Sequence, residues 1–329
     1  MAVIARRLVF FVITLWAALT INFFLPRLMP GGPVLAMMSR FRGHVTPQAM
    51  RSLELAFGVD IHENLLAQYI QYLGDIAQGR FGLSVSFFPV PVAQILMQAL
   101  PWTLGLIGVT TIISFALGTL IGMVAAWRRG GLADSVLPPV LVVVSAFPYF
   151  WFGLICIYLF SAGLGWFPSG FAYDLGSPVA LSWSFAGQVL RHAALPAFTI
   201  TITSIGGWLL TMRNNMIATL SEDYVRMARA KGLSPLRIMV LYAGRNAVLP
   251  NITGFALSLG FVLSGALLTE IVFTYPGLGY LLYQAVVGED YPLMQAIFLL
   301  ITVAVLAAVL LADVANVLLD PRTRGHQYR

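Results

Sequence analysis

Six apolar segments, each about the length of a membrane-crossing helix, constrain what this chain can fold into. A helix needs about 20 mostly apolar residues to cross the hydrocarbon core of a bilayer. The composition agrees, because 59% of the residues are hydrophobic and 10% are charged, whereas soluble domains are roughly 45–50% apolar. We therefore predict an all-α integral membrane protein with six transmembrane helices. The predicted helices cover residues 8–28, 99–127, 136–162, 192–213, 249–273 and 292–319.

The first apolar segment follows two basic residues, an arrangement that it shares with secretory signal peptides. Arg6 and Arg7 precede an apolar stretch that runs to Leu25. This stretch is longer than the roughly 7–15 apolar residues of a signal peptide, and no cleavage site with small residues follows it. We therefore interpret residues 1–28 as an N-terminal segment with a retained first transmembrane helix.

Basic residues gather in the connections on one side of the predicted helices. Arg128 and Arg129 follow the second helix. Further basic residues are concentrated in the connection between the fourth and fifth helices and in the C-terminal tail. The connection between the fifth and sixth helices carries Glu289 and Asp290 and no basic residue. Since basic residues favour the cytoplasmic side of a membrane protein, we expect both termini in the cytoplasm. The net charge of +6 has the same explanation, so we expect no nucleic-acid partner.

Residues 29–98 are predicted to form a long, partly helical loop on the extracytoplasmic side. The segment 46–58 begins with Thr46 and Pro47, a suitable N-cap and first helical residue, and ends at Gly58. The segment 63–79 repeats apolar residues at helical spacing. We expect two short amphipathic helices that cap an outer mouth, lie on the bilayer surface or act as a structural lid. Residues 99–329 are then a five-helix core.

The sequence lacks several catalytic and metal-binding motifs, which narrows the function. A phosphate-binding loop ends in Gly-Lys followed by Ser or Thr, but the only lysine, Lys231, lies in RAKGL. Cys156 is the single cysteine, and the scattered histidines show no metal-ligand spacing, so we expect no metal site, no cofactor bound by this chain and no catalytic residue. Glu270 and Asp313 lie in the predicted helices, without the series of carboxylates that a proton-coupled carrier needs.

The scarce charge concentrates in residues 221–250, between the fourth and fifth predicted helices. Ser221 suits the N-cap of a short helix, acidic residues follow it, basic residues occupy the last turn, and Gly232 ends the helix. Ser234 and Pro235 then begin a second helix. A short helix with small residues and a few apolar side chains suits insertion into a groove of another protein. A helix held on the membrane face by anionic lipid is the alternative.

Two motifs in this region, DYVRMARAKG and RNAVLP, resemble the EAA signature of permease subunits of binding-protein-dependent ABC importers. The stretches LPRLMPGGPV, FGVDIHENLLAQYIQYLGDIAQGRFGLS, LTEIVFTYPGLGYLLYQAV and LLDPRTR are similar to the B-type (first) subunit of the dipeptide, oligopeptide and nickel permease family. The resemblance covers nearly the whole chain. The general signature opens with Glu-Ala-Ala, where this chain has Arg226, Met227 and Ala228, and it has a proline where this chain has Arg245. Further departures, QGRFGLS and MPGGPV in the outer loop, leave the substrate open.

The resemblance implies the type I ABC importer permease fold in a bacterial or archaeal plasma membrane. It identifies a coupling helix at about residues 221–232, which sits in a groove of a cytoplasmic ATPase subunit, and a second helix, at 236–247, which transmits its motion. The residues carried over to the coupling role are Glu222, Asp223, Tyr224, Arg226, Ala228, Arg229, Ala230, Lys231 and Gly232.

The same resemblance implies the partners of this chain. They are two ATPase subunits that bind ATP and Mg²⁺, a homologous second permease subunit in a heterodimer, and an extracytoplasmic substrate-binding protein. Closure of the ATPase subunits would rock the helices between inward-facing and outward-facing states, and this chain would form half of the translocation pathway.

Small polar residues of the predicted helices are candidates for the lining of that pathway. Small hydroxyl residues also pack at the interfaces of membrane helices, so each candidate has helix packing as its alternative. For Glu270 the alternatives are a substrate amine, an outer gate and an ordinary hydrogen bond at the membrane edge. The candidates are Thr110, Ser114, Ser145, Thr203, Asn251, Ser258 and Glu270, followed by Thr103, Thr111, Thr199, Ser204 and Thr253.

We expect di- and oligopeptides as the substrate, with oligosaccharides, opines or chelated nickel as alternatives for the same machinery. A stand-alone carrier or channel is the alternative of a different class, and a structural membrane protein is a third. The segment 223–250 discriminates between them, because a stand-alone protein has no reason to display a docking helix.

Overall fold

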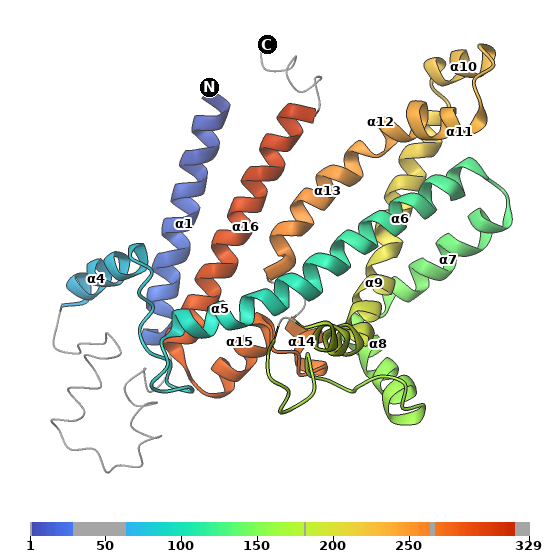
Figure 1. Cartoon of the computed structure of the whole chain (residues 1–329). Coiled ribbons are helices and arrows are strands. Elements are labelled where there is room, and N and C mark those ends of the chain that lie inside the picture. Colours follow the sequence, from blue (N-terminus) through green and yellow to red (C-terminus); the bar gives the residue numbers. More distant parts are fainter. Residues whose placement is uncertain (1, 29–63, 181, 264–266, 320–329) are drawn as a thin grey trace. The chain divides into compact units, whose positions relative to one another are not determined.

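The computed structural model describes residues 2–28, 64–180, 182–263 and 267–319, and the regular elements in these ranges are all helices (Figure 1). This confirms the predicted all-α class, while the helix predicted at residues 46–58 lies outside the described residues. The elements are α1 (Ala2–Leu28), α4 (Leu65–Ala77), α5 (Val92–Thr103), η1 (Leu104–Gly108), α6 (Val109–Trp127), α7 (Leu132–Ala146), α8 (Tyr149–Cys156), η2 (Ile157–Gly163), α9 (Trp183–Leu220), α10 (Asp223–Ala230), α11 (Pro235–Arg237), η3 (Ile238–Gly244), α12 (Arg245–Ala247), α13 (Leu249–Gly260), η4 (Phe261–Leu263), α14 (Leu267–Val272), α15 (Leu278–Val287) and α16 (Tyr291–Leu319).

Three described helical runs are long and apolar enough to cross a membrane, and they coincide with three of the predicted spans. The runs are Val92–Trp127, Trp183–Leu220 and Tyr291–Leu311. The first of them joins α5, the π-helical turn η1 and α6 into one helix. The first run begins before its predicted span and ends where predicted, the second extends past both predicted ends, and the third begins at Tyr291, next to the predicted start at residue 292.

The predicted span 136–162 is a bent pair of helices in the structure. The two halves, Asp134–Ala146 and Tyr149–Gly163, meet at an angle of 95°. The break falls at Phe147, whose backbone is extended (φ −75°, ψ 137°). The next residue is Pro148, and proline displaces the residue before it from the helical region.

The other two predicted spans are less regular, so the count of six stays a prediction. The apolar part of α1 is the shorter helix Leu8–Phe24. The predicted span 249–273 comprises α13, the 3₁₀ turn η4 and α14, with residues 264–266 outside the described ranges.

Contacts divide the chain into two compact units. The first comprises residues 1–103 and 276–307, and the second comprises residues 104–275 and 308–329. In the first unit, α4 packs on α1: the hydroxyls of Tyr69 and Thr20 lie 2.7 Å apart, and the buried ring of Phe23 meets that of Tyr69 edge-on. Asn22 and Gln295 each donate a side-chain hydrogen bond to the other's carbonyl, at 2.8 and 2.7 Å, and so join α1 to α16.

In the second unit, α6 and α9 approach closely because glycines remove the side chains between them. A Cβ added to Gly118 would lie 2.5 Å from Trp208 Cβ, and one added to Gly122 would lie 2.5 Å from the Leu209 carbonyl oxygen. Small residues of this kind let membrane helices pack backbone to backbone. The α6–α9 pair therefore forms a closely packed core of the second unit.

Candidate functional site

The charged segment folds as a short helix, α10, at one end of the second unit (Figure 1). Its N-cap is Glu222, with extended backbone and no side-chain hydrogen bond. The prediction that Ser221 is the N-cap is wrong. Ser221 is the helical C-cap of the preceding helix α9, and its hydroxyl donates 2.7 Å to the carbonyl of Ala218. Its backbone is helical (φ −85°, ψ −10°), whereas an N-cap residue typically has extended backbone.

The other end of α10 follows the prediction. Gly232 has a positive φ of 74° and donates 2.9 Å to the carbonyl of Arg229, while the amide of Leu233 donates 3.3 Å to the carbonyl of Ala228. This pair of hydrogen bonds is the Schellman motif, in which the left-handed position favours glycine. Ser234 and Pro235 then begin α11 as N-cap and first helical residue, as predicted.

One face of α10 is buried in the core of its own chain. Val225 and Ala228 are 0% and 2% exposed and belong to an apolar cluster with Met212 and Met216 of α9. The remaining buried members of this cluster, which we call the anchor cluster, are Ala126, Ile238, Ala243 and Ala247. Because its side chain is turned inward, we remove Ala228 from the predicted docking surface.

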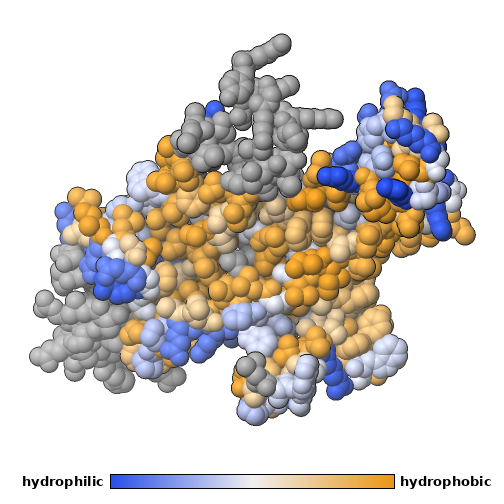
Figure 2. All heavy atoms as spheres, turned by 45° about the horizontal axis from the view of Figure 1, so that its top comes forward, coloured by the Kyte–Doolittle hydropathy of each residue, from blue (hydrophilic) through white to orange (hydrophobic). Residues whose placement is uncertain are grey.

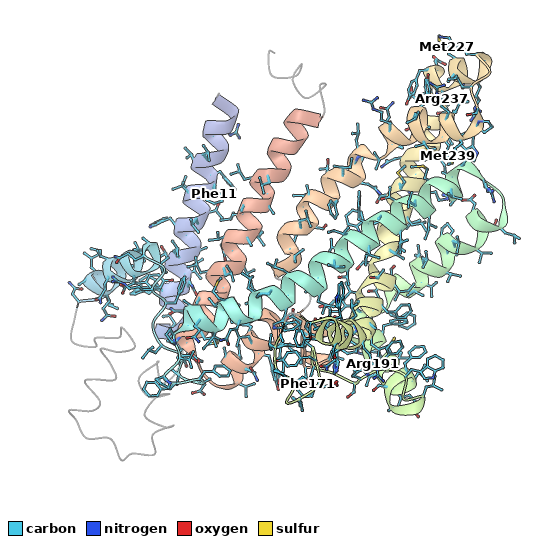
Figure 3. The ribbon with its side chains drawn as sticks, viewed as in Figure 1. Phe11, Phe171, Arg191, Met227, Arg237 and Met239 are labelled. Carbon is cyan, nitrogen blue, oxygen red and sulfur yellow. The ribbon has the colours of Figure 1, made fainter. Side chains whose placement is uncertain are left out.

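The opposite face of α10 is exposed. Tyr224 and Met227 are 38% and 59% exposed, and Figure 3 shows Met227 on α10 at the end of the second unit. Tyr224 belongs to the predicted coupling set and Met227 does not; the other exposed members of that set are Glu222, Asp223, Arg226, Arg229, Ala230, Lys231 and Gly232. Figure 2 shows that hydrophilic residues gather at this end, whereas the exposed sides of the long helices are hydrophobic. We call this exposed set the docking face.

Polar contacts also tie α10 to neighbouring helices. The Asn246 amide donates 2.8 Å to the Tyr224 hydroxyl, and the guanidinium of Arg229 lies 5.9 Å from the centroid of the Trp127 ring. The helix predicted at 236–247 is present as α11, the π-helical segment η3 and α12, which lead into α13. The segment is thus a compact helical hairpin fastened to α6 and α9.

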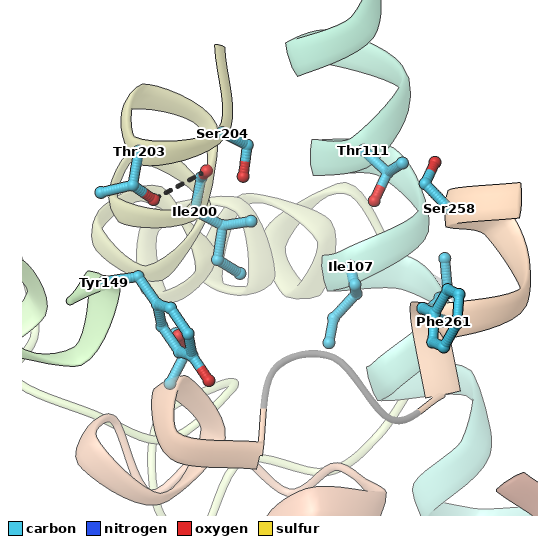
Figure 4. A pocket seen from close by; sticks show the side chains of 10 residues that line it. Ile107, Thr111, Tyr149, Ile200, Thr203, Ser204, Ser258 and Phe261 are labelled. Atoms are coloured by element: carbon cyan, nitrogen blue, oxygen red, sulfur yellow. Dashed lines mark hydrogen bonds between the residues drawn. The ribbon is translucent and has the colours of Figure 1, made fainter. Parts of the chain in front are cut away.

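A second feature of the same unit is a pair of adjoining cavities. The larger, of about 410 Å³, is lined by Thr111, Ser114, Ser204, Gly207, Trp208, Thr211 and Ser258. The smaller, of about 170 Å³, is lined by Ile107, Thr111, Tyr149, Ile200, Thr203, Ser204, Ser258, Phe261, Val262 and Thr269. Figure 4 shows the smaller one, with Thr203 and Ser204 facing Thr111 and Ser258 across the space. The two share residues, so we treat them as one hydroxyl-lined cavity.

The structure brings some predicted pathway residues to this cavity and buries others away from it. Ser114, Thr203 and Ser258 line it, as do Thr111 and Ser204. The predicted candidates Thr110, Ser145, Asn251 and Glu270 are not among the lining residues, and neither are Thr103, Thr199 and Thr253.

The candidates outside the cavity have structural roles in the described residues. Thr110 and Ser145 donate 2.7 Å to carbonyls of their own helices. Asn251 is fully buried and donates to the Thr119 hydroxyl at 3.0 Å and the Trp208 carbonyl at 3.1 Å, joining α13 to α6 and α9. Glu270 is 1% exposed. Tyr275 follows α14. Its burial, together with the negative charge of the Glu270 carboxylate, raises the pKa of its hydroxyl to about 12.

Sequence reasoning missed Tyr149, Trp208, Thr211 and Thr269 as cavity residues. A signal was available for two of them, because Ser204, Trp208 and Thr211 follow one another at spacings of four and three residues on α9. Such spacing places side chains on one face of a helix. The described residues contain no group of three or more His, Cys, Asp and Glu side chains that could hold a metal ion.

Apolar helices long enough to cross a membrane, a polar cavity and an anchored short helix with an exposed face are features of a membrane transport subunit. The chain belongs to the family of binding-protein-dependent transport system inner membrane components, whose family model matches residues 118–325. It is a multi-pass inner-membrane protein and not an enzyme, and members of this family work with ATPase subunits and binding proteins.

Three relatives match the chain over nearly its whole length. It is 36% identical to the di/tripeptide transport system permease protein DppB of Pseudomonas aeruginosa, 34% identical to the probable peptide ABC transporter permease protein y4tP of Sinorhizobium fredii, and 32% identical to the oligopeptide transport system permease protein AppB of Bacillus subtilis. Each alignment covers 98% of this chain and 98% of the relative. These similarities and the helical structure give the type I permease fold.

Proposed function

We propose that this chain is a permease subunit of an ATP-driven importer of di- and oligopeptides, and that α10 couples it to an ATPase subunit. The named relatives support the substrate class, since all three are described as permeases for peptides. The chain would bind no cofactor itself, and ATP and Mg²⁺ would be held by the partner ATPase subunits. Oligosaccharides, opines and chelated nickel remain the alternative cargoes of the same machinery.

The observation that carries the coupling role is the division of α10 into two faces. The anchor cluster holds Val225 and Ala228 within the chain, while Tyr224, Met227 and Arg226 stand exposed on the docking face. A helix of eight residues has little stability by itself, so a force applied to the docking face passes into the helices that anchor it. This arrangement suits rigid-body transfer of motion and gives a stand-alone carrier no advantage.

The orientation follows from charge. Arg226, Arg229, Lys231 and Arg237 lie on the α10–α11 segment, and basic residues favour the cytoplasmic side. The docking face would therefore meet a cytoplasmic ATPase subunit, and both termini would be cytoplasmic. A homologous second permease subunit would complete a heterodimer, and an extracytoplasmic binding protein would deliver substrate.

Alternating access would then move substrate through the hydroxyl-lined cavity. Closure of the ATPase subunits upon ATP would displace α10, and α6 and α9 would follow because their backbones are packed together through Gly118 and Gly122. The cavity would open toward one side of the membrane and then the other.

A pair of substitutions at Gly232 tests the coupling role. No atom of this chain lies within 4 Å of a Cβ added there, so the strain within the chain comes from the left-handed backbone, which costs roughly 1–2 kcal/mol for ordinary residues and less for asparagine. We expect Gly232→Val to reduce peptide uptake about tenfold and Gly232→Asn to remain near the parent. If the solubilised complex carries no ATPase subunit and Gly232→Val transports normally, the proposed function fails.

A further inference from the structure

The hydroxyl-lined cavity has no charged side chain among its lining residues. Its polar character comes from serine, threonine and tyrosine hydroxyls, each of which has one proton to donate and lone pairs to accept with. How those protons are used decides which ligand groups the wall can bind.

Several of these protons are already donated within the helices that carry them. Ser114 donates 2.6 Å to the carbonyl of Thr110, and Thr211 donates 3.0 Å to that of Gly207. Thr203 and Ser258 do the same on α9 and α13, at 2.8 Å each. A hydroxyl engaged in this way offers only its lone pairs to a ligand. These four positions are therefore hydrogen-bond acceptors toward the cavity.

The lining of the smaller cavity adds a buried polar atom without a partner. Thr269 is 0% exposed, lines the smaller cavity, and its hydroxyl oxygen makes no hydrogen bond. An unsatisfied buried hydroxyl costs about 1–3 kcal/mol until a ligand or water meets it. Thr111 and Ser204, on the shared wall, can turn their protons either way and so adapt to what the other hydroxyls require.

The larger cavity is also lined by an aromatic side chain, that of Trp208. Four neighbouring residues fix the position of Trp208. Gly118 and Gly254 leave room for Trp208, since an added Cβ would lie 2.5 Å from Trp208 Cβ and 3.3 Å from its ring, respectively. The Asn251 side-chain amide donates 3.1 Å to the Trp208 carbonyl. The rings of Phe115 and Trp208 meet edge to face, with their centroids 5.5 Å apart. Indole is the side chain whose face attracts cations most strongly.

The basic side chain of α9 that follows Thr211 most closely is already paired with an acidic residue and is not among the residues that line the cavity. Arg213 lies two residues after Thr211, and its Nε donates 2.6 Å to Asp134 Oδ1, whose side chain is 7% exposed. The guanidinium is thus paired with a carboxylate on α7.

We propose that this cavity binds N–H donors of the transported peptide, above all its protonated amino end, with Trp208 as the aromatic face against which the ammonium rests. The inference rests on the proposed function, because it concerns the substrate of the same pathway. Acceptor hydroxyls and an indole stabilise an ammonium, whereas a carboxylate would meet the lone pairs of the four engaged hydroxyls and the negative face of the ring. The carboxyl end of the peptide is left to the other subunit or to water.

Thiol labelling of the complete importer complex in nanodiscs tests this assignment. Thr211→Cys is treated with 2-aminoethyl methanethiosulfonate, a primary ammonium, and with the anionic 2-sulfonatoethyl reagent, each rate being divided by that with free mercaptoethanol. We expect the ammonium reagent to react about tenfold faster. The parent chain gives the background, since its one cysteine, Cys156, is buried.

Two comparisons separate recognition from simple access. Trp208→Leu should bring the two rates together, whereas Trp166→Leu, which removes an exposed indole (60%) outside the cavity lining, should leave their ratio unchanged. Trialanine should slow the labelling of Thr211→Cys, and N-acetyl-trialanine at the same concentration should slow it far less.

The outcomes also separate this inference from the proposed function. Equal rates for the two reagents, or equal protection by the two peptides, would overturn the ammonium assignment and leave the pathway intact. If neither reagent reaches Thr211→Cys, the cavity does not open to water, and the pathway and the ammonium assignment both fail.

Discussion

The anchor cluster makes a sharp prediction about coupling, because one buried side chain can be shortened without touching the docking face. Val225 is 0% exposed and packs with Met212, Met216 and Ile238. Val225→Ala removes two methyl groups, at about 0.8 kcal/mol each, and leaves a cavity, so the anchoring of α10 should weaken by about 2 kcal/mol. That free energy shifts the ratio of anchored to detached α10 by about thirtyfold.

The expected phenotype is uncoupling rather than loss of assembly. The docking face of Val225→Ala is unchanged, so the ATPase subunit should still co-purify and hydrolyse ATP. Peptide taken up per ATP hydrolysed should fall, because a loosened α10 moves without carrying α9. Met227→Ala is the matched control: Met227 is 59% exposed, so its truncation should weaken co-purification and leave thermal stability within about 0.5 kcal/mol of the parent.

Reconstituted proteoliposomes report both quantities, with labelled tripeptide for uptake and phosphate release for hydrolysis. Anchoring of α10 through Val225 is refuted if Val225→Ala keeps the parental ratio of uptake to hydrolysis while its thermal stability drops. It also fails if the two substitutions exchange phenotypes, because the buried and exposed faces would then have been assigned the wrong way round.

Three further predictions concern the helices that support the site. Gly122→Ala should destabilise the protein by about 1–3 kcal/mol, since its Cβ would lie 2.5 Å from a carbonyl of α9, whereas Gly187→Ala, with no atom within 4 Å, should be neutral or stabilising in a thermal melt. Asp290→Asn should lower stability by about 1–3 kcal/mol, because the buried carboxylate accepts from the Ser84 hydroxyl and two backbone amides and an amide would present a donor to one of them. Arg213→Gln should cost about 3 kcal/mol by leaving Asp134 without its cation, and the double variant with Asp134→Asn should cost less than the sum in the same melt.

The C-terminal end of α10 and the start of α11 were predicted correctly from the sequence, because the chemistry of a few adjacent residues determines them. Gly232 alone among neighbouring residues accepts a left-handed backbone freely, and Ser234-Pro235 restarts a helix whatever surrounds it. The start of α10 was predicted less well, since Ser221 is as suitable for the end of α9 as for an N-cap. The choice between these roles depends on how far α9 extends, and tertiary packing sets that length.

Which side chains of α10 are buried could not be predicted from the local sequence. Small residues at 228 and 230 are equally compatible with a partner's groove and with the chain's own core, and only the position of α9 and η3 shows that Ala228 packs inward while Ala230 is exposed. A related limit explains why only some of the predicted pathway residues line the cavity. Thr110 and Ser114 make the same hydrogen bond to their helix, so residue type does not reveal which one borders the cavity.

The position of the two sites on α9 suggests how movement at one could reach the other. Thr203, Ser204, Trp208 and Thr211 line the cavity, and Met212 and Met216 begin the anchor cluster on the same helix. Thr211 and Met212 are adjacent, so no hinge or loop separates the cavity wall from the cluster that holds α10. A helix of 38 residues packed against α6 through Gly118 and Gly122 resists bending between these points. Displacement of α10 should therefore reach Trp208 and its neighbours as a shift of the whole wall, and a ligand held against that wall should in turn bias the position of α10.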